Sequence, residues 1–262
     1  MIGYVHGHHD SVLKSHRTRT AENSAGHLLP HLEAGMSLLD IGSGPGTITV
    51  DLARRVGRVT ALETSEEILA LTRAEADRSG VEIEGVVGDV HALELPDDSF
   101  DVVHAHQVLQ HVHDPVTALR EMKRVCRPGG LVSVREGDYH GFVIAPRTAS
   151  YDTWLTLYDL AARERGGEPD AGRFLLGWAH RAGFTQVTSL SSTWCWSTPE
   201  ARQWWGDMWA ERITDSALAQ QLLDGGHATR ADLDEIAAGW QSWAADPDGW
   251  MSVLHGVILA RA

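Results

Sequence analysis

Leu38-Leu39-Asp40-Ile41-Gly42-Ser43-Gly44-Pro45-Gly46 decides the fold of this chain. The apolar run that begins at Met36 is typical of a buried parallel strand, and the glycines that follow let the backbone turn tightly and approach a ligand. A dinucleotide-binding turn is the obvious alternative, but its G-x-G-x-x-G spacing needs a glycine where this sequence has Thr47. The stretch therefore predicts a strand, a ligand-binding turn and a following helix.

Strand and helix patterns alternate on both sides of this turn, which indicates a parallel sheet covered on both faces. We expect strands at 36–41, 58–62, 81–87, 100–105 and 131–135, and helices at 21–32, 47–56, 65–78 and 115–126. We expect two more helices at 151–165 and 171–183, and two final strands at 186–196 and 252–259.

The second half of the chain differs in composition, because all ten tryptophans lie at or beyond Trp154. Residues 197–247 carry five of them in a polar, helical segment between two predicted strands, which indicates an insertion. Either they pack the core of a helical cap, or they line an apolar ligand pocket. We predict four parts: a helical segment or lid at 1–35, a core at 36–196, the cap at 197–247 and a last strand at 248–262.

Charge and cysteine content narrow the function. The net charge of -14 repels phosphate backbones and anionic lipid, so we expect neither nucleic-acid nor membrane partners. Two separated cysteines, Cys126 and Cys195, form neither a disulfide framework nor a four-thiolate zinc site. The first residues have no signal-peptide pattern, and no apolar run is long enough for a membrane helix. We expect a cytoplasmic monomer or homodimer.

Carboxylates end the next two predicted strands. Glu63 closes the second strand, where it can accept both hydroxyls of a ribose. Asp89 closes the third, where it can accept from an exocyclic amine, while the N–H of Val90 donates to a ring nitrogen. Each residue alone is compatible with an ordinary strand end. Together, at the carboxyl edge of one sheet, they predict an adenosyl ligand.

The ordered set resembles the class I S-adenosylmethionine-dependent methyltransferases, above all the ubiquinone/menaquinone-type and natural-product small-molecule enzymes. Besides the glycine-rich turn, it includes Glu63, Gly88-Asp89, the stretch Leu95 to Val103, and Arg127-Pro128-Gly129-Gly130. The resemblance implies a Rossmann-like, doubly wound α/β fold with a seven-stranded sheet and a helical insertion before the last strand. It also implies S-adenosyl-L-methionine as cofactor. The cofactor-binding residues that it implies are Asp40, Gly42, Ser43, Gly44, Gly46, Glu63, Thr64, Asp89, Val90, His106 and Gln107.

The residues after the fourth strand bear on the acceptor. They read His104-Ala105-His106-Gln107, not the Asn/Asp-Pro-Pro-Tyr box of enzymes that methylate nucleobase or glutamine nitrogens. We therefore expect a small-molecule acceptor, a metabolite or natural product. A histidine suits a general base because its pKa lies near neutrality, and the candidates are His8, His9, His111 and His140. For each of them a structural role is the alternative, and we expect no metal.

Two other functions are compatible with this fold. One is a cofactor-binding protein that no longer transfers methyl, which catalyses another reaction or serves as a partner subunit. The other is a nicotinamide oxidoreductase, which Thr47 disfavours.

Overall fold

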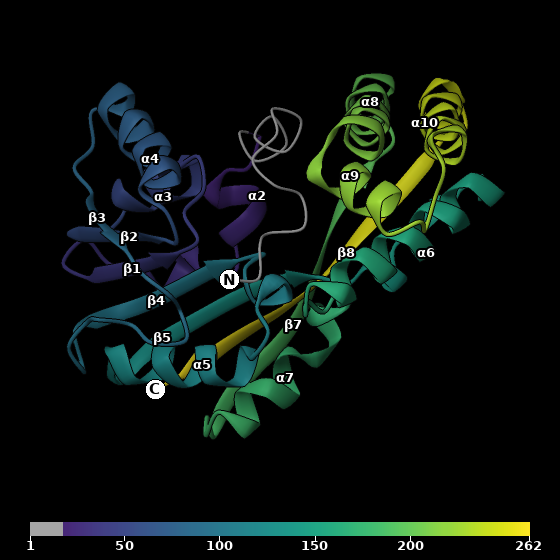
Figure 1. Cartoon of the computed structure of the whole chain (residues 1–262). Coiled ribbons are helices and arrows are strands. Elements are labelled where there is room, and N and C mark those ends of the chain that lie inside the picture. Colours follow the sequence, from purple (N-terminus) through teal and green to yellow (C-terminus); the bar gives the residue numbers. More distant parts are fainter. Residues whose placement is uncertain (1–17) are drawn as a thin grey trace.

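The computed structural model describes residues 18–262 (Figure 1). Within them, one eight-stranded sheet comprises β1 (Ser37–Ile41), β2 (Arg58–Glu63), β3 (Glu84–Val87), β4 (Phe100–His106), β5 (Cys126–Gly137), β6 (Val143–Ala145), β7 (Gln186–Trp196) and β8 (Trp250–Arg261). The α-helices are α2 (Ala21–Ala25), α3 (Thr47–Ala53), α4 (Glu66–Ser79), α5 (Pro115–Val125), α6 (Ala149–Glu164), α7 (Ala171–Arg181), α8 (Pro199–Asp215), α9 (Ala217–Asp224) and α10 (Arg230–Ala245). Three 3₁₀ helices are η1 (Leu29–His31), η2 (Leu109–His111) and η3 (Tyr139–Gly141).

The strand order is β3-β2-β1-β4-β5-β8-β6, with β7 on the other side of β8. Strands β1 to β5 are parallel, whereas β8 runs antiparallel to β5, β6 and β7. Because the first five strands are parallel, their carboxyl ends share one edge of the sheet, where ligands bind in open α/β sheets. The predicted Rossmann-like fold is confirmed, with one strand more than the seven expected. The extra strand, β6, has three residues, too few for a period-two pattern in the sequence.

Helices cover both faces of the sheet, with α2, α3 and α4 on one face and α5 and α7 on the other (Figure 1). Leu38, Val102 and Leu131 form one core cluster with residues of α2 and α3. Alternate residues of the same strands, such as Val103 and Val134, form a second cluster with α5 and α7. This alternation is the period-two geometry of a strand buried on both faces.

Some element ends differ from the sequence prediction. The helix expected at 21–32 is the short α2 followed by η1, because Pro30 lacks the N–H that a continued α-helix requires. Strand β3 starts at Glu84, since the N–H of Val81 still donates to Ala76 at the end of α4. Strand β5 extends on both sides of the expected 131–135. At its amino end, Gly129 and Gly130 pair with the backbone of Ala262.

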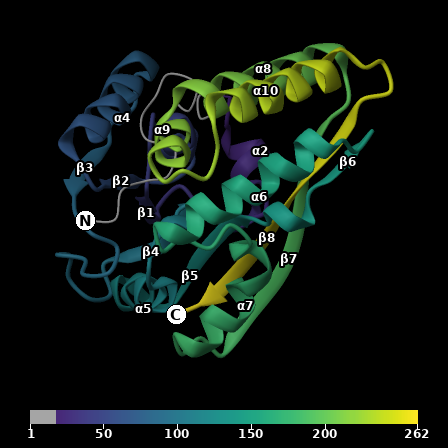
Figure 2. The same ribbon diagram turned by 45° about the vertical axis from the view of Figure 1, so that its right-hand side comes forward.

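Helices α8, α9 and α10 lie between β7 and β8 in sequence, and α8 and α10 lie side by side above α6 (Figure 2). An aromatic core joins them, in which Trp154 of α6 contacts Trp209 and Trp240 at ring-centroid distances of 4.6 and 5.0 Å. Trp205 and Trp243 are buried in the same core. These tryptophans therefore pack the cap, as the first of the two interpretations held. Among residues 18–262, no helix has both the length and the apolar character needed to cross a membrane.

Candidate functional site

The glycine-rich turn joins the end of β1 to the start of α3. Gly42, Gly44 and Gly46 all have positive φ, and Gly46 is the N-cap of α3. A Cβ at Gly42 would lie 2.5 Å from Val108 Cγ2, and one at Gly46 would lie 2.9 Å from the Cα of Thr72. Larger residues at these positions would need both a strained backbone and displaced neighbours. The turn follows the end of β1 and therefore lies at the carboxyl edge of the sheet.

Asp40 lies beneath this turn and is 3% exposed. Its Oδ2 accepts from the hydroxyl of Thr49 at 2.6 Å, and its Oδ1 accepts from Nδ1 of His104 at 2.7 Å. The carboxylate therefore ties β1 to α3 and β4. Ser43 also faces inward, since its hydroxyl lies 2.9 Å from that of Thr72 on α4.

Glu63 ends β2 beside the turn. Its Oε1 accepts the N–H of Gly44 at 2.6 Å, and its Oε2 accepts the N–H of Thr64 at 3.2 Å. Burial raises the pKa of this carboxyl, against the lowering effect of both backbone hydrogen bonds. Thr64 itself is exposed. The structure thus brings Glu63 and the glycine turn together, as the sequence suggested.

Asp89 and Val90 follow β3, the strand next to β2. Val90 is buried, whereas the Asp89 side chain is 66% exposed. Asp89 Oδ1 accepts from the backbone N–H and Nδ1 of His91, and the backbone bond is the main cause that lowers the Asp89 pKa. Oδ2 accepts no hydrogen bond from the described residues, so it is available to a ligand's donor.

The end of β4 carries His106 and Gln107. His106 is 6% exposed, and within the described chain neither of its ring nitrogens has a hydrogen-bond partner. Gln107 has a positive φ of 54°, which directs its side chain between Arg19 and His255. Both residues therefore lie at the carboxyl edge, next to the turn in strand order.

Residues distant in sequence complete this region. Arg135 of β5 pairs with His106 in the strand register, and its guanidinium lies 4.6 Å from the ring of Trp194 on β7. The Trp194 ring also lies 5.9 Å from that of His106 and 4.5 Å from that of His255 on β8. Sequence reasoning missed Arg135, Trp194 and His255. A charged residue inside a predicted buried strand was the available signal for Arg135.

Comparisons with known proteins identify the family to which this chain belongs. Residues 39–134 match the model of the Methyltransferase domain family. An uncharacterized methyltransferase of Schizosaccharomyces pombe is 33% identical, over 98% of this chain and 96% of that protein. The chain belongs to the class I S-adenosylmethionine-dependent methyltransferases. S-adenosylmethionine is therefore its cofactor.

Two further likenesses cover less of this methyltransferase. A ubiquinone biosynthesis O-methyltransferase of Aeromonas salmonicida is 37% identical over 38% of this chain and 42% of that protein. The solved structure of Haemonchus contortus phosphoethanolamine N-methyltransferase 2, with phosphomonomethylethanolamine and S-adenosylhomocysteine, has a TM-score of 0.54. It is 18% identical, over 88% of this chain and 49% of that one, so it bears on the fold alone.

Two of the four histidines predicted as possible bases, His111 and His140, lie within the described part of this methyltransferase. His8 and His9 fall outside the described residues. His111 on η2 is half-buried. Its Nε2 lies 3.0 Å from Nε2 of Gln110. Burial lowers the pKa of His111 to about 3, so its imidazole is neutral at neutral pH.

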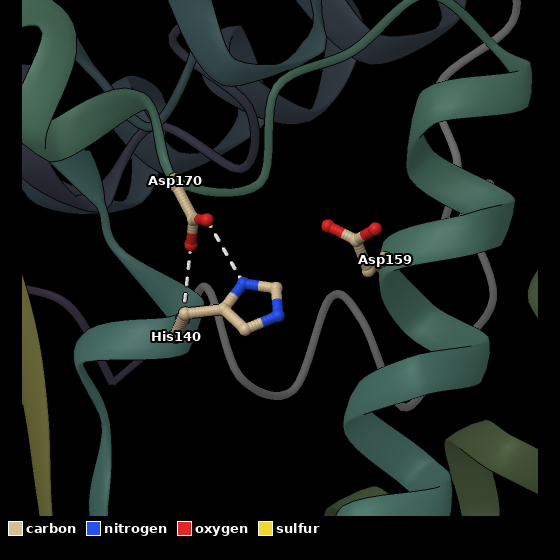
Figure 3. A group of neighbouring side chains, drawn as sticks. All are labelled: His140, Asp159 and Asp170. Carbon is tan, nitrogen blue, oxygen red and sulfur yellow. Dashed lines mark hydrogen bonds and ion pairs between the residues drawn. The ribbon is translucent and has the colours of Figure 1, made fainter.

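His140 is on η3, and its side chain is 43% exposed. Its backbone N–H and its Nδ1 both bond to the carboxylate of Asp170, while Asp159 of α6 faces the ring from the other side (Figure 3). These three side chains are close enough to hold a metal ion. However, Arg163 pairs with Asp159 at 2.9 Å and approaches Asp170 at 3.8 Å. Because Arg163 and Arg173 both lie against these carboxylates and would repel a cation, we assign no metal to the cluster.

Proposed function

We propose that this methyltransferase transfers the methyl group of S-adenosylmethionine to a small-molecule acceptor bound beyond the end of β4. The observation that carries the proposal is His106, a buried imidazole with both nitrogens unpartnered within the described chain. Buried polar groups are normally hydrogen-bonded, so an orphaned pair at the edge where ligands bind indicates a ligand that completes them. An enclosed position suits a small molecule better than a polymer.

The donor set at the sheet edge fits the cofactor. In this proposal Glu63 accepts the ribose hydroxyls, and Oδ2 of Asp89 and the N–H of Val90 bind the adenine. The main chain at Gly42, Gly44 and Gly46 binds the methionine moiety, and His106 and Gln107 border the transferable methyl. Ser43 and Asp40 would act from beneath the turn, by fixing its conformation.

The cofactor supplies an electrophilic methyl on a sulfonium, so the protein mainly aligns the acceptor, excludes water and takes up a proton where the nucleophile carries one. Burial lowers the pKa of His106 well below its usual value. The ring is therefore neutral, and can accept one hydrogen bond while donating another. Among the described residues, His111 and His140 remain candidates for the general base.

The negative net charge supports a small acceptor, since it disfavours nucleic acid. The name of one similar protein adds to this, because it concerns ubiquinone biosynthesis.

The test is transfer of radiolabel from S-adenosylmethionine to a panel of hydroxylated and aminated metabolites, with RNA, DNA and protein mixtures in parallel. We expect label in at least one small molecule and none in the polymers. Label only in a polymer would refute the proposal. Tight binding of S-adenosylhomocysteine without any transfer would instead favour a protein that holds the cofactor for another purpose.

A further inference from the structure

Arg135 is a buried cation beside the end of β4, with 1% of its surface exposed. Its Nε donates to the hydroxyl of Ser192 at 2.9 Å, and its guanidinium stacks near the Trp194 ring. Its Nη1 has no hydrogen-bond partner among the described residues. A cation–π contact fixes the position of this side chain but does not satisfy its N–H donors.

The neighbouring His255 does not supply the missing acceptor. Arg19 donates to Oε1 of Gln107 at 2.6 Å, which fixes the orientation of the Gln107 amide. The amide nitrogen Nε2 of Gln107 therefore donates to Nε2 of His255, 2.9 Å away. Because Nε2 of His255 accepts this hydrogen bond, the proton of the neutral imidazole must be on Nδ1. Nδ1–H donates to the carbonyl of Val253 at 3.1 Å. Nη2 of Arg135, 3.0 Å from Nδ1, thus faces another donor.

No described carboxylate forms an ion pair with Arg135. The carboxylate of the adjacent Glu136 accepts the backbone N–H groups of Val108, Leu109 and Gln110. Both oxygens of Asp40 are bonded to Thr49 and His104. Burying a charge is costly unless an opposite charge compensates it, so the buried Arg135 guanidinium indicates an anionic ligand.

We propose that Arg135 and His106 form an anion-binding subsite for a carboxylate of the methyl acceptor, an inference that rests on the small-molecule acceptor proposed above. Two observations meet here, the uncompensated guanidinium and the unpartnered imidazole, on adjacent positions of neighbouring strands. A guanidinium binds a planar carboxylate through two parallel N–H donors, and a neutral imidazole adds a third. The acceptor is thus an organic acid whose carboxylate anchors it beside the transferable methyl.

The experiment is calorimetric titration of the full chain, saturated with S-adenosylhomocysteine, with benzoate and with its neutral analogue benzamide. We expect benzoate to bind, and benzamide to bind at least about tenfold more weakly, because the charge-assisted hydrogen bonds are lost. Arg135→Met should reduce benzoate affinity by about tenfold or more. Arg135→Lys should recover part of it, since an ammonium keeps the charge but not the planar fork.

Arg127→Gln is the matched control, because Arg127 is on the same strand but exposed and paired with Asp101. It should leave benzoate affinity unchanged. Should Arg135→Met fail to fold, Arg135→Lys and His106→Phe carry the same test, each with reduced benzoate affinity. Equal binding of benzoate and benzamide, no benzoate binding at all, or unaltered binding by these variants overturns the subsite.

The titration also separates two sources of the carboxylate. We expect Arg135→Met to bind S-adenosylhomocysteine as the parent does. An equal loss of both affinities would assign the subsite to the carboxylate of the cofactor's own methionine and overturn the proposal. Failure of the proposed function would show in the radiolabel experiment, as cofactor binding without label transfer to any small molecule. The benzoate titration would still decide whether the subsite exists.

Discussion

Asp40 and His104 form a buried hydrogen bond beneath the glycine-rich turn, with Oδ1 2.7 Å from Nδ1. Both residues are almost fully buried and are directly paired in the register of β1 and β4. The same carboxylate also bonds to Thr49 in α3. One side chain therefore fixes the strand before the turn, the helix after it and the neighbouring strand.

We expect Asp40→Ala to lower the free energy of unfolding by about 3 kcal/mol, because two buried donors lose their acceptor. Thr49→Val should cost about 1 kcal/mol, since it removes one hydrogen bond. Denaturant unfolding measures both. If Asp40 affects the cofactor only by holding the glycine-rich turn in place, His104→Ala should weaken S-adenosylhomocysteine binding as Asp40→Ala does. If only Asp40→Ala weakens this binding, Asp40 contacts the cofactor directly.

Replacement of Glu63 by alanine tests the ribose contact. We expect affinity for S-adenosylhomocysteine to fall about tenfold or more, as charge-assisted hydrogen bonds are removed. The thermal transition of the ligand-free protein should barely move, because losing two backbone contacts is offset by losing a desolvated carboxylate. Calorimetry with Glu67→Ala, an exposed carboxylate at the start of α4, is the control. Unchanged affinity in Glu63→Ala would falsify the placement.

Stability should fall in mild acid, in part through His27. Its Nε2 lies 3.0 Å from the Ser133 hydroxyl, and burial lowers its pKa from 6.5 to about 3. The unfolded chain then binds more protons than the folded one between these values. This contribution is therefore complete above pH 6.5 and is lost as pH falls toward 3, by up to about 1.4 kcal/mol per pH unit.

His27→Gln should consequently lose less thermal stability than the parent between about pH 7 and pH 5. His180→Gln, at an exposed position on α7, should behave as the parent does. Differential scanning calorimetry at both pH values measures this. A parent-like pH dependence in His27→Gln would show that the His27 proton is not the cause.

Trp209 tests the cap. It is 1% exposed in the aromatic core between α6, α8 and α10. We expect Trp209→Ala to lower the free energy of unfolding by about 3–5 kcal/mol, while S-adenosylhomocysteine affinity stays within about twofold. Trp204→Ala, at a half-buried position five residues earlier on α8, should cost less. If Trp209→Ala leaves stability unchanged but raises the Michaelis constant of the acceptor, the alternative of an acceptor-lining tryptophan is correct.

Local sequence patterns were sufficient to predict the glycine-rich turn and the acids at the carboxyl ends of the strands. The turn from Gly42 to Gly46 and the acids Glu63 and Asp89 are each defined within a few residues of a strand end. Once five strands are known to be parallel, their carboxyl ends must meet at one edge. The ends of helices and strands could not be predicted where the hydrophobic pattern is interrupted or too short. Examples are Pro30, which ends the helical pattern, and β6, which has three residues.

The residues of the proposed acceptor site come together only in the tertiary structure. Gln107 and His255 are 148 residues apart and meet only because β8 inserts antiparallel beside β5. Trp194 reaches Arg135 for the same reason, since β7 pairs with β8. A sequence pattern records which face a side chain takes on its own strand, but not which strands become neighbours. Strand order results from packing the whole sheet. The sequence alone therefore determined the glycine-rich turn and the acids at the carboxyl edge, whereas only the tertiary structure brought Arg135, Trp194 and His255 together, where we propose the anion-binding subsite.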